Sequence, residues 1–215
     1  MKRFLTAFIA LVGLAWGVEM LSATGAVASA PGNPWAVREH ALTLTGLGSF
    51  ALMSLAMVLA TRPARLERFF GGMDRIYRVH KWAGILAVGF AVLHWLVELS
   101  DDLIKTLWGR EGRLPKDHGG GLLEAMRDVA EELGEFAIYA LLAMLVLTLW
   151  KRFPFRIWRY VHKGMPVLYL ALAFHAAFLA PLDYWTQPVG VLLASLIAAG
   201  SVASVRVLAG RIGQD

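Results

Sequence analysis

Four of the six histidines lie inside long apolar stretches of the sequence. His80 and His94 fall in one stretch, and His162 and His175 fall in a later one, at separations of 14 and 13 residues. An ionisable side chain is costly in a membrane-length apolar segment, so such residues usually serve a function. A neutral imidazole offers one nitrogen lone pair to a metal. The two matched pairs therefore predict metal ligation inside apolar segments.

The two pairs differ in helical phase. Residues 14 apart on an α-helix lie within about 40° of one face and about 21 Å apart along the axis. Residues 13 apart are separated by about 19.5 Å but point about 140° apart on an ideal helix. Pro166 stands between His162 and His175 and removes an internal hydrogen bond, so we expect a kink that brings this pair onto one face.

The composition predicts a membrane protein. The chain has 215 residues, of which 58% are hydrophobic and 17% charged, with a mean hydropathy of +0.57. Soluble domains average about 45–50% apolar and about 25% charged residues. The sequence contains no cysteine, which excludes thiolate metal sites, iron–sulfur clusters and c-type haem attachment. The net charge of +5 is interpreted as a topology signal, and no nucleic-acid partner is expected.

Six stretches approach the length of about 20 helical residues that a bilayer core requires. The predicted spans cover about residues 4–21, 41–60, 77–97, 136–150, 158–179 and 189–205. Residues 100–135 are expected to form an outer loop, and the second half of this loop predicts an amphipathic helix on the membrane surface. A lid over a buried cofactor is the alternative for that half. Residues 1–30 could also be a signal peptide with a cleavage site at Ala28–Ala30, which would leave five spans.

The distribution of lysine and arginine predicts the orientation. If the N-terminus lies inside, the inner side carries 15 of the 21 basic residues and 3 of the 16 acidic residues. Cytoplasmic loops carry such an excess of positive charge. We therefore expect a bacterial-type inner (plasma) membrane protein with both termini in the cytoplasm. His80 and His162 then lie near the cytoplasmic side, and His94 and His175 lie near the outer side.

Histidines at equal depth can share one metal. Two imidazoles that face each other in a bundle core can both ligate one haem iron. The sequence therefore predicts a six-transmembrane-helix bundle with two stacked bis-His haem sites. Zinc is disfavoured because the two levels are too far apart for one tetrahedral site and the sequence has no HExxH motif. A haem-free transporter whose histidines bind protons or ions is the alternative from another class.

Two segments carry a family resemblance, namely MDRIYRVHKWAGILAVGFAVLH at residues 73–94 and WRYVHKGMPVLYLALAFH at residues 158–175. They resemble the transmembrane domain of the ferric reductase and NADPH oxidase superfamily, as do LATR at residues 59–62 and the stretch 132–139. The resemblance implies two haems b, oxidoreductase activity and outward electron flow. It also implies a cytoplasmic flavin (FAD) and NAD(P)H-binding domain or subunit as donor. The implied external acceptor is a ferric complex, oxygen or a periplasmic protein.

The expected donor domain has no counterpart in the sequence. No GxGxxG motif is present, and the chain continues for ten residues after the sixth predicted span. We therefore expect the flavin domain to follow in a longer protein or to be a separate subunit, and we expect that neither NADH nor NADPH reduces this chain by itself.

Two positions distinguish branches of the superfamily. NADPH oxidases resemble one another in a further histidine four residues after the outer ligand of the third span. Glu98 stands there, which argues against a dedicated oxygen site. Haem subunits that serve a periplasmic methionine sulfoxide reductase usually lack the inner histidine that His80 supplies. The closer resemblance is to a bacterial ferric reductase-like protein. A haem b subunit that serves a periplasmic reductase or quinol, or an NADPH-oxidase-like oxygen reductase, is the alternative.

Charged residues flank both histidine levels. Four basic residues at the cytoplasmic mouth are candidates for contacts to haem propionates or to a flavin domain, although the positive-inside pattern also explains them: Arg78, Lys81, Arg159 and Lys163. On the outer side, three acidic residues lie within about two turns of His94: Glu98, Asp101 and Asp102. They are predicted to attract a cationic or metal-complex acceptor, or otherwise only to mark a non-cytoplasmic loop.

Overall fold

The protein is helical throughout the part of the chain that the computed structural model describes, which is residues 2–22, 33–62, 64–113, 120–150 and 152–212. In chain order the elements are α1 (Lys2–Ser22), α2 (Pro34–Ala60), α3 (Ala64–Phe70), α4 (Met73–Trp108), α5 (Leu122–Leu149), α6 (Phe155–His162), α7 (Met165–Leu179), the 3-10 helix η2 (Leu182–Thr186) and α8 (Pro188–Ile212). The predicted all-α class is confirmed.

Four of these helices are long and apolar enough to cross a membrane. They are α2, α4, α5 and residues 188–210 of α8, and they contain the second, third, fourth and sixth predicted spans. The first predicted span corresponds to α1, which has 21 residues, and the fifth corresponds to α6 and the 15-residue α7. The protein is therefore an integral membrane protein built from helices.

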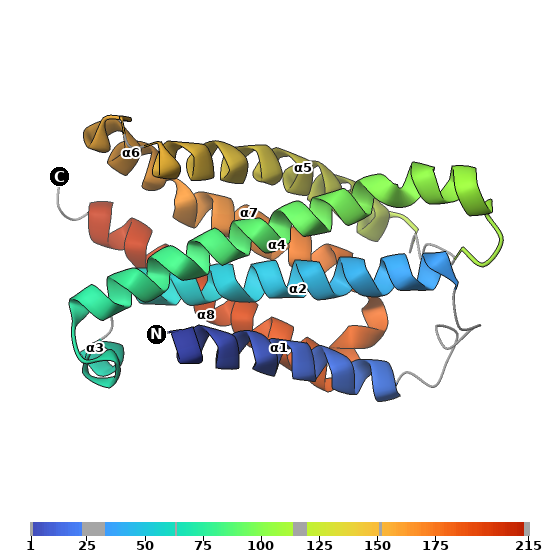
Figure 1. Ribbon diagram of the computed structural model, residues 1–215, viewed down its shortest axis with the longest axis horizontal. Coiled ribbons are helices and arrows are strands. Elements are labelled where there is room, and N and C mark those ends of the chain that lie inside the picture. Colours follow the sequence, from blue (N-terminus) through green and yellow to red (C-terminus); the bar gives the residue numbers. More distant parts are fainter. Residues whose placement is uncertain (1, 23–32, 63, 114–119, 151, 213–215) are drawn as a thin grey trace.

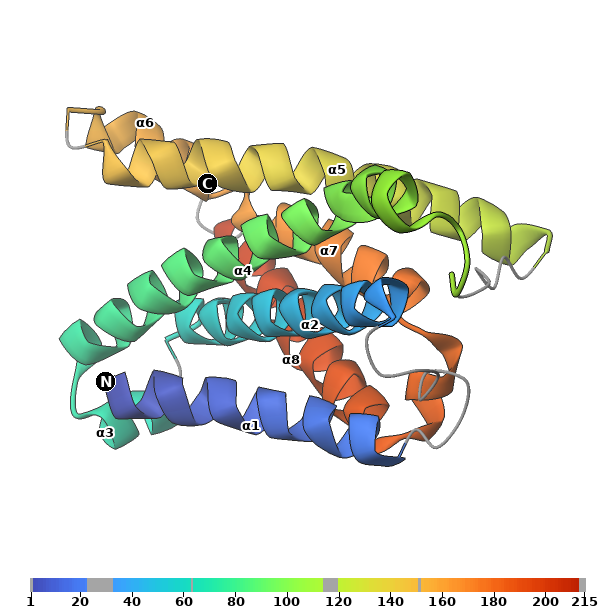
Figure 2. The same ribbon diagram turned by 45° about the vertical axis from the view of Figure 1, so that its right-hand side comes forward.

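Helix α2 lies at the centre of the bundle. It packs against α1, α4, α7 and α8, and Figures 1 and 2 show it running between α4 and α8. The segment 41–60 of α2 contains no charged residue, so every face of the helix can be buried at little cost. Ala51, Leu52 and Leu59 are accordingly at most 1% exposed. This central position lets α2 contact the helices that carry three of the four histidines.

The connections gather at two ends of the bundle. Figure 1 shows α3, α6, the first residues of α1 and the last residues of α8 at one end, which we call the inner end. The C-terminal end of α4, the N-terminal end of α5 and η2 lie at the opposite, outer end. The basic segments around α3 and α6, which the charge pattern assigns to the cytoplasm, thus share one end.

Two helices extend beyond the predicted spans. α4 has 36 residues, so the first part of the predicted outer loop 100–135 continues this helix. The second half of that loop is the N-terminal part of α5, which runs without interruption into the fourth span. The prediction of a separate surface helix was therefore wrong. The segment 122–149 contains no proline, so no residue in it removes a helical hydrogen bond. The suggested cleavage site at Ala28–Ala30 lies outside the described residues.

The predicted fifth span is two helices. α6 ends at His162 and α7 begins at Met165, with Lys163 and Gly164 between them. The Gly164 N–H donates to the Val161 carbonyl at 2.9 Å, which closes a tight turn. Pro166 lies in the first turn of α7, where a missing N–H leaves no helical acceptor unsatisfied. The predicted kink at the proline is thus a complete break just before it.

Candidate metal centres

The structure places the four histidines in two facing pairs. The ring centroids of His80 and His162 are 6.1 Å apart with planes at 78°, and those of His94 and His175 are 6.3 Å apart with planes at 82°. With metal–nitrogen bonds of about 2.0 Å and a ring radius of about 1.1 Å, two imidazoles on opposite sides of one metal have centroids about 6.2 Å apart. Both separations fit axial ligation of one metal by two imidazoles.

Backbone carbonyls orient three of the four rings. The Nδ1 atoms donate over 2.7–2.9 Å, from His80 to Ala56, from His94 to Leu42 and from His175 to Ala130. A carbonyl oxygen can only accept, so Nδ1 carries the proton in each of these rings. Nε2 of the neutral imidazole then keeps its lone pair, which is the form that binds a metal.

Helix α2 orients both histidines of α4. Its two accepting residues, Leu42 and Ala56, are separated by 14 residues, and so are His94 and His80 on α4. The two helices run in opposite directions and therefore keep a single register over both levels.

Two glycines make room for the outer rings. Gly46 stands four residues after Leu42, and Gly134 stands four residues after Ala130. A Cβ at Gly46 would lie 3.0 Å from His94 ring atoms, and a Cβ at Gly134 would lie 2.4 Å from His175 ring atoms. Because helical Cβ atoms tilt toward the N-terminus, a side chain at position i+4 would crowd the carbonyl at position i. Sequence analysis missed both glycines. The available signal was a glycine facing a histidine inside a membrane helix.

His162 is the last residue of α6, and its ring stacks on the indole of Trp158. The centroids are 4.8 Å apart and the planes differ by 18°. The Trp158 indole N–H donates to Thr148 Oγ1 on α5 at 2.9 Å. The break at residues 163–164 frees His162 from the helical phase of α7, so the 140° offset expected for a continuous helix does not apply.

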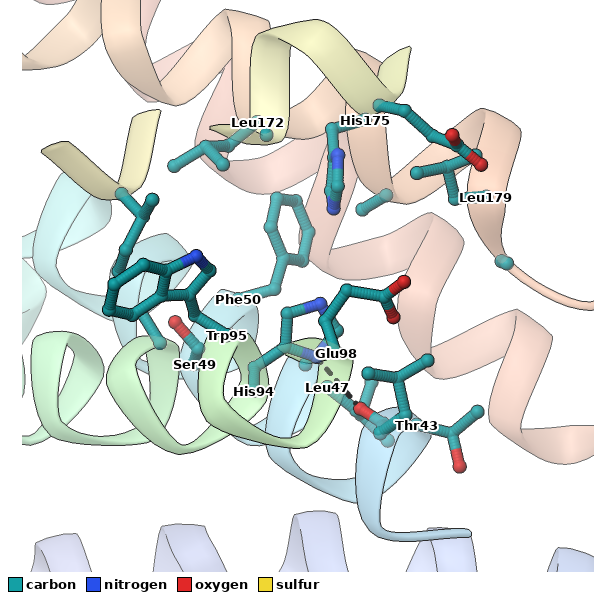
Figure 3. Close-up of a pocket in the computed structure, with 18 of the residues that line it drawn as sticks. Thr43, Leu47, Ser49, Phe50, His94, Trp95, Glu98, Leu172, His175 and Leu179 are labelled. Carbon is teal, nitrogen blue, oxygen red and sulfur yellow. Dashed lines mark hydrogen bonds between the residues drawn. The ribbon is translucent and has the colours of Figure 1, made fainter. Parts of the chain in front are cut away.

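A cavity of about 730 Å³ lies at the outer pair. Figure 3 shows His94 and His175 pointing into it from opposite sides, with Phe50 and Leu172 in its wall. Cofactor sites commonly have volumes of about 300–1,000 Å³. The cavity is therefore large enough for a cofactor between the two rings.

The donor set favours a metal that brings its own equatorial ligands. Among the described residues, no group of three or more His, Asp or Glu side chains could hold a metal ion. A haem iron takes four ligands from its porphyrin and needs two from the protein. The paired imidazoles, their free Nε2 atoms and the outer cavity fit haem better than they fit a bare ion.

The acidic residues predicted near the outer ligand have basic partners. The ion pairs are Glu98 with Arg38 at 2.8 Å, Asp101 with Lys105 and with Arg113, and Asp102 with Lys105 at 3.0 Å. These partners offset much of the negative potential predicted there. Glu98 also lines the cavity, together with five further acidic residues: Glu39, Asp128, Glu131, Glu132 and Glu135. The carboxylates nearest the outer pair thus come mainly from α5, whose acidic stripe the sequence placed on the membrane surface.

The four basic residues predicted at the cytoplasmic mouth are exposed at the inner end: Arg78, Lys81, Arg159 and Lys163. Lys163 Nζ lies 5.8 Å from the centroid of the Tyr160 ring. Their exposure leaves them accessible to a partner or to lipid headgroups.

Comparison with known proteins identifies the family. The family model described as "Ferric reductase like transmembrane component" matches residues 45–173, which include His80, His94 and His162. A search of curated proteins found no match to the chain. The match covers more than half of the 215 residues and agrees with the resemblance seen in the histidine segments. The chain therefore belongs to the ferric reductase-like transmembrane family, and with it to membrane proteins that have an oxidoreductase-type role in electron transfer.

Proposed function

We propose that the chain is the membrane-embedded electron-transfer part of a ferric reductase-like oxidoreductase with two haem b sites. His80 and His162 hold the inner haem, and His94 and His175 hold the outer one. The geometry of the facing pairs supports this, because both centroid separations lie near 6.2 Å. Haem iron, when bound, supplies reversible one-electron chemistry. The chain supplies two imidazoles per level, fixes their tautomers and surrounds the outer pair with a largely apolar wall.

The spacing of the two levels suits transfer across a membrane. The 14 residues between His80 and His94 correspond to about 21 Å of helix, which is most of a hydrocarbon core about 30 Å thick. A cytoplasmic flavin domain or subunit that binds NAD(P)H would meet the inner end, where Arg78, Lys81, Arg159 and Lys163 are exposed. The external acceptor, for which we favour a ferric complex, would meet the outer cavity beside Glu98.

A direct test is the visible spectrum of the protein purified from haem-sufficient cells. We expect a sharp Soret band that shifts on reduction with dithionite, and two haems b per chain in a pyridine haemochrome assay. A folded, fully helical preparation without haem would contradict the proposal and favour a haem-free transporter.

We further propose six membrane spans, with α1 and the α6–α7 unit added to the four long helices, and with both termini in the cytoplasm. A reporter fused after residue 215 should then read cytoplasmic, and one inserted after Gly112, at the outer end, should read external. The physical reason is the concentration of basic residues at the inner end. The reverse pattern at the two sites would overturn the orientation and the assignment of inner and outer pairs.

A further inference from the structure

The inner ligand His162 belongs to a run of near-parallel aromatic rings on α6. Trp158 and His162 are one turn apart and stack at 4.8 Å with planes 18° apart. Phe155 stacks on Trp158 at 5.4 Å with planes 22° apart. Offset-stacked rings at such distances attract each other beyond the burial of their surface. The stack therefore restricts rotation of the His162 ring about its bond to Cβ.

Trp158 is itself fixed to a second helix. Its indole N–H donates to Thr148 Oγ1 at 2.9 Å, and the Thr148 hydroxyl donates to the Met144 carbonyl at 2.7 Å. Both acceptors lie on α5, which joins α6 across residues 150–154. The plane of the indole is thus defined by α5, and the plane of His162 follows the indole.

We propose that Trp158 is a positioning residue that sets the ring plane of His162, the distal member of the inner pair. This inference rests on the proposed function, because it concerns a ligand of the proposed inner haem. It assigns to Trp158 the orienting task that the Leu42, Ala56 and Ala130 carbonyls perform for the other three histidines. Residues that orient a metal ligand in this way affect both the affinity and the electronic properties of the site.

The angle between the two rings gives this role a spectroscopic signature. His80 and His162 have planes 78° apart. When the planes of two axial imidazoles are nearly perpendicular, the two iron d orbitals that interact with them have similar energies, and the paramagnetic resonance signal of the oxidised low-spin iron is strongly anisotropic. A ring that turns away from this angle reduces the anisotropy. The outer pair, at 82°, acts as an internal reference in the same molecule.

The test compares Trp158→Leu and Trp158→Phe in the haem-loaded, full-length protein. Low-temperature paramagnetic resonance and haem content are measured, and the inner and outer signals are assigned with His80→Ala and His94→Ala. We expect Trp158→Leu to lose the inner haem, from two per chain toward one, or to reduce the anisotropy of its signal, with the outer signal unchanged. Trp158→Phe keeps a stacking ring and should restore the inner signal. Thr148→Val removes the acceptor of the indole and should shift the same signal in the same direction by less.

Trp150→Leu is the matched control, because Trp150 also lies at the inner end but is 56% exposed. It should leave both signals as in the wild type. Wild-type signals in Trp158→Leu, equal changes of both signals, or failure of Trp158→Phe to restore the inner one would overturn the positioning role while leaving the proposed function intact. A wild-type protein without haem would instead overturn the proposed function, and the positioning role with it.

Discussion

Alanine at His94 or at His175 is expected to lower the haem content from two per chain to about one. The two rings face each other at 6.3 Å, so either replacement leaves the outer metal with a single axial imidazole from the chain. Since both residues serve one site, the double variant should cost no more than either single variant, which is the expected non-additivity for groups that act as a unit. Haem content is measured as pyridine haemochrome per chain.

The pairing is tested by crossing the levels. The double variant of His80 and His94, which removes one ligand from each level, should lose both haems. His40→Ala is the control, because the His40 ring makes an edge contact with Trp16 at 6.2 Å and belongs to neither pair. If the double variant of His94 and His175 lost both haems while the crossed variant retained one, the assignment of ligands to levels would be wrong.

A methyl group at Gly134 should abolish the outer site almost as completely as loss of a ligand. The Cβ of alanine would lie 2.4 Å from Cε1 and Nδ1 of His175, well inside van der Waals contact. The ring would have to leave the Ala130 carbonyl, which it contacts at 2.7 Å, and its Nε2 would no longer face His94. We expect about one haem per chain in Gly134→Ala, with the inner haem retained.

Two other glycines grade this effect. A Cβ at Gly46 would lie 3.0 Å from the His94 ring, so Gly46→Ala should keep the outer haem with an altered spectrum. A Cβ at Gly13 on α1 meets no atom within 4 Å, and Gly13→Ala should therefore match the wild type. Equal haem content in all three variants would show that the outer ring is not confined by Gly134.

The depth of the histidines could be predicted from sequence, because it depends on span length and on the charge of the loops. Pairing by depth needed no knowledge of side-chain contacts, and the structure places the pairs face to face. The position of the break could not be predicted so well. Pro166 disrupts a helix interior but is well tolerated in a first turn, and only the folded chain shows that Gly164 lets α7 begin just before it.

Partners that depend on the register between helices were also beyond sequence reasoning. Gly46 and Gly134 are two of 21 glycines, and nothing in their local sequence shows that they face His94 and His175. Trp158 likewise reads as one of eight tryptophans until α6 is folded against α5. The acidic stripe of α5 is similar, because whether it faces water or a cavity depends on how α5 packs against α4 and α7.

The shared register of α2 and α4 has a mechanical consequence. Leu42 and Ala56 hold His94 and His80 on one pair of antiparallel helices, so the two levels cannot move closer together or farther apart by a small slide. A slide would break both carbonyl contacts at once, and a new match would require a shift of a full helical turn, about 5.4 Å. Electron tunnelling falls off exponentially with distance, so redox groups bound at these levels would keep a constant rate of exchange while the surrounding bilayer thickens, thins or bends. In this sense α2 works as a ruler for α4.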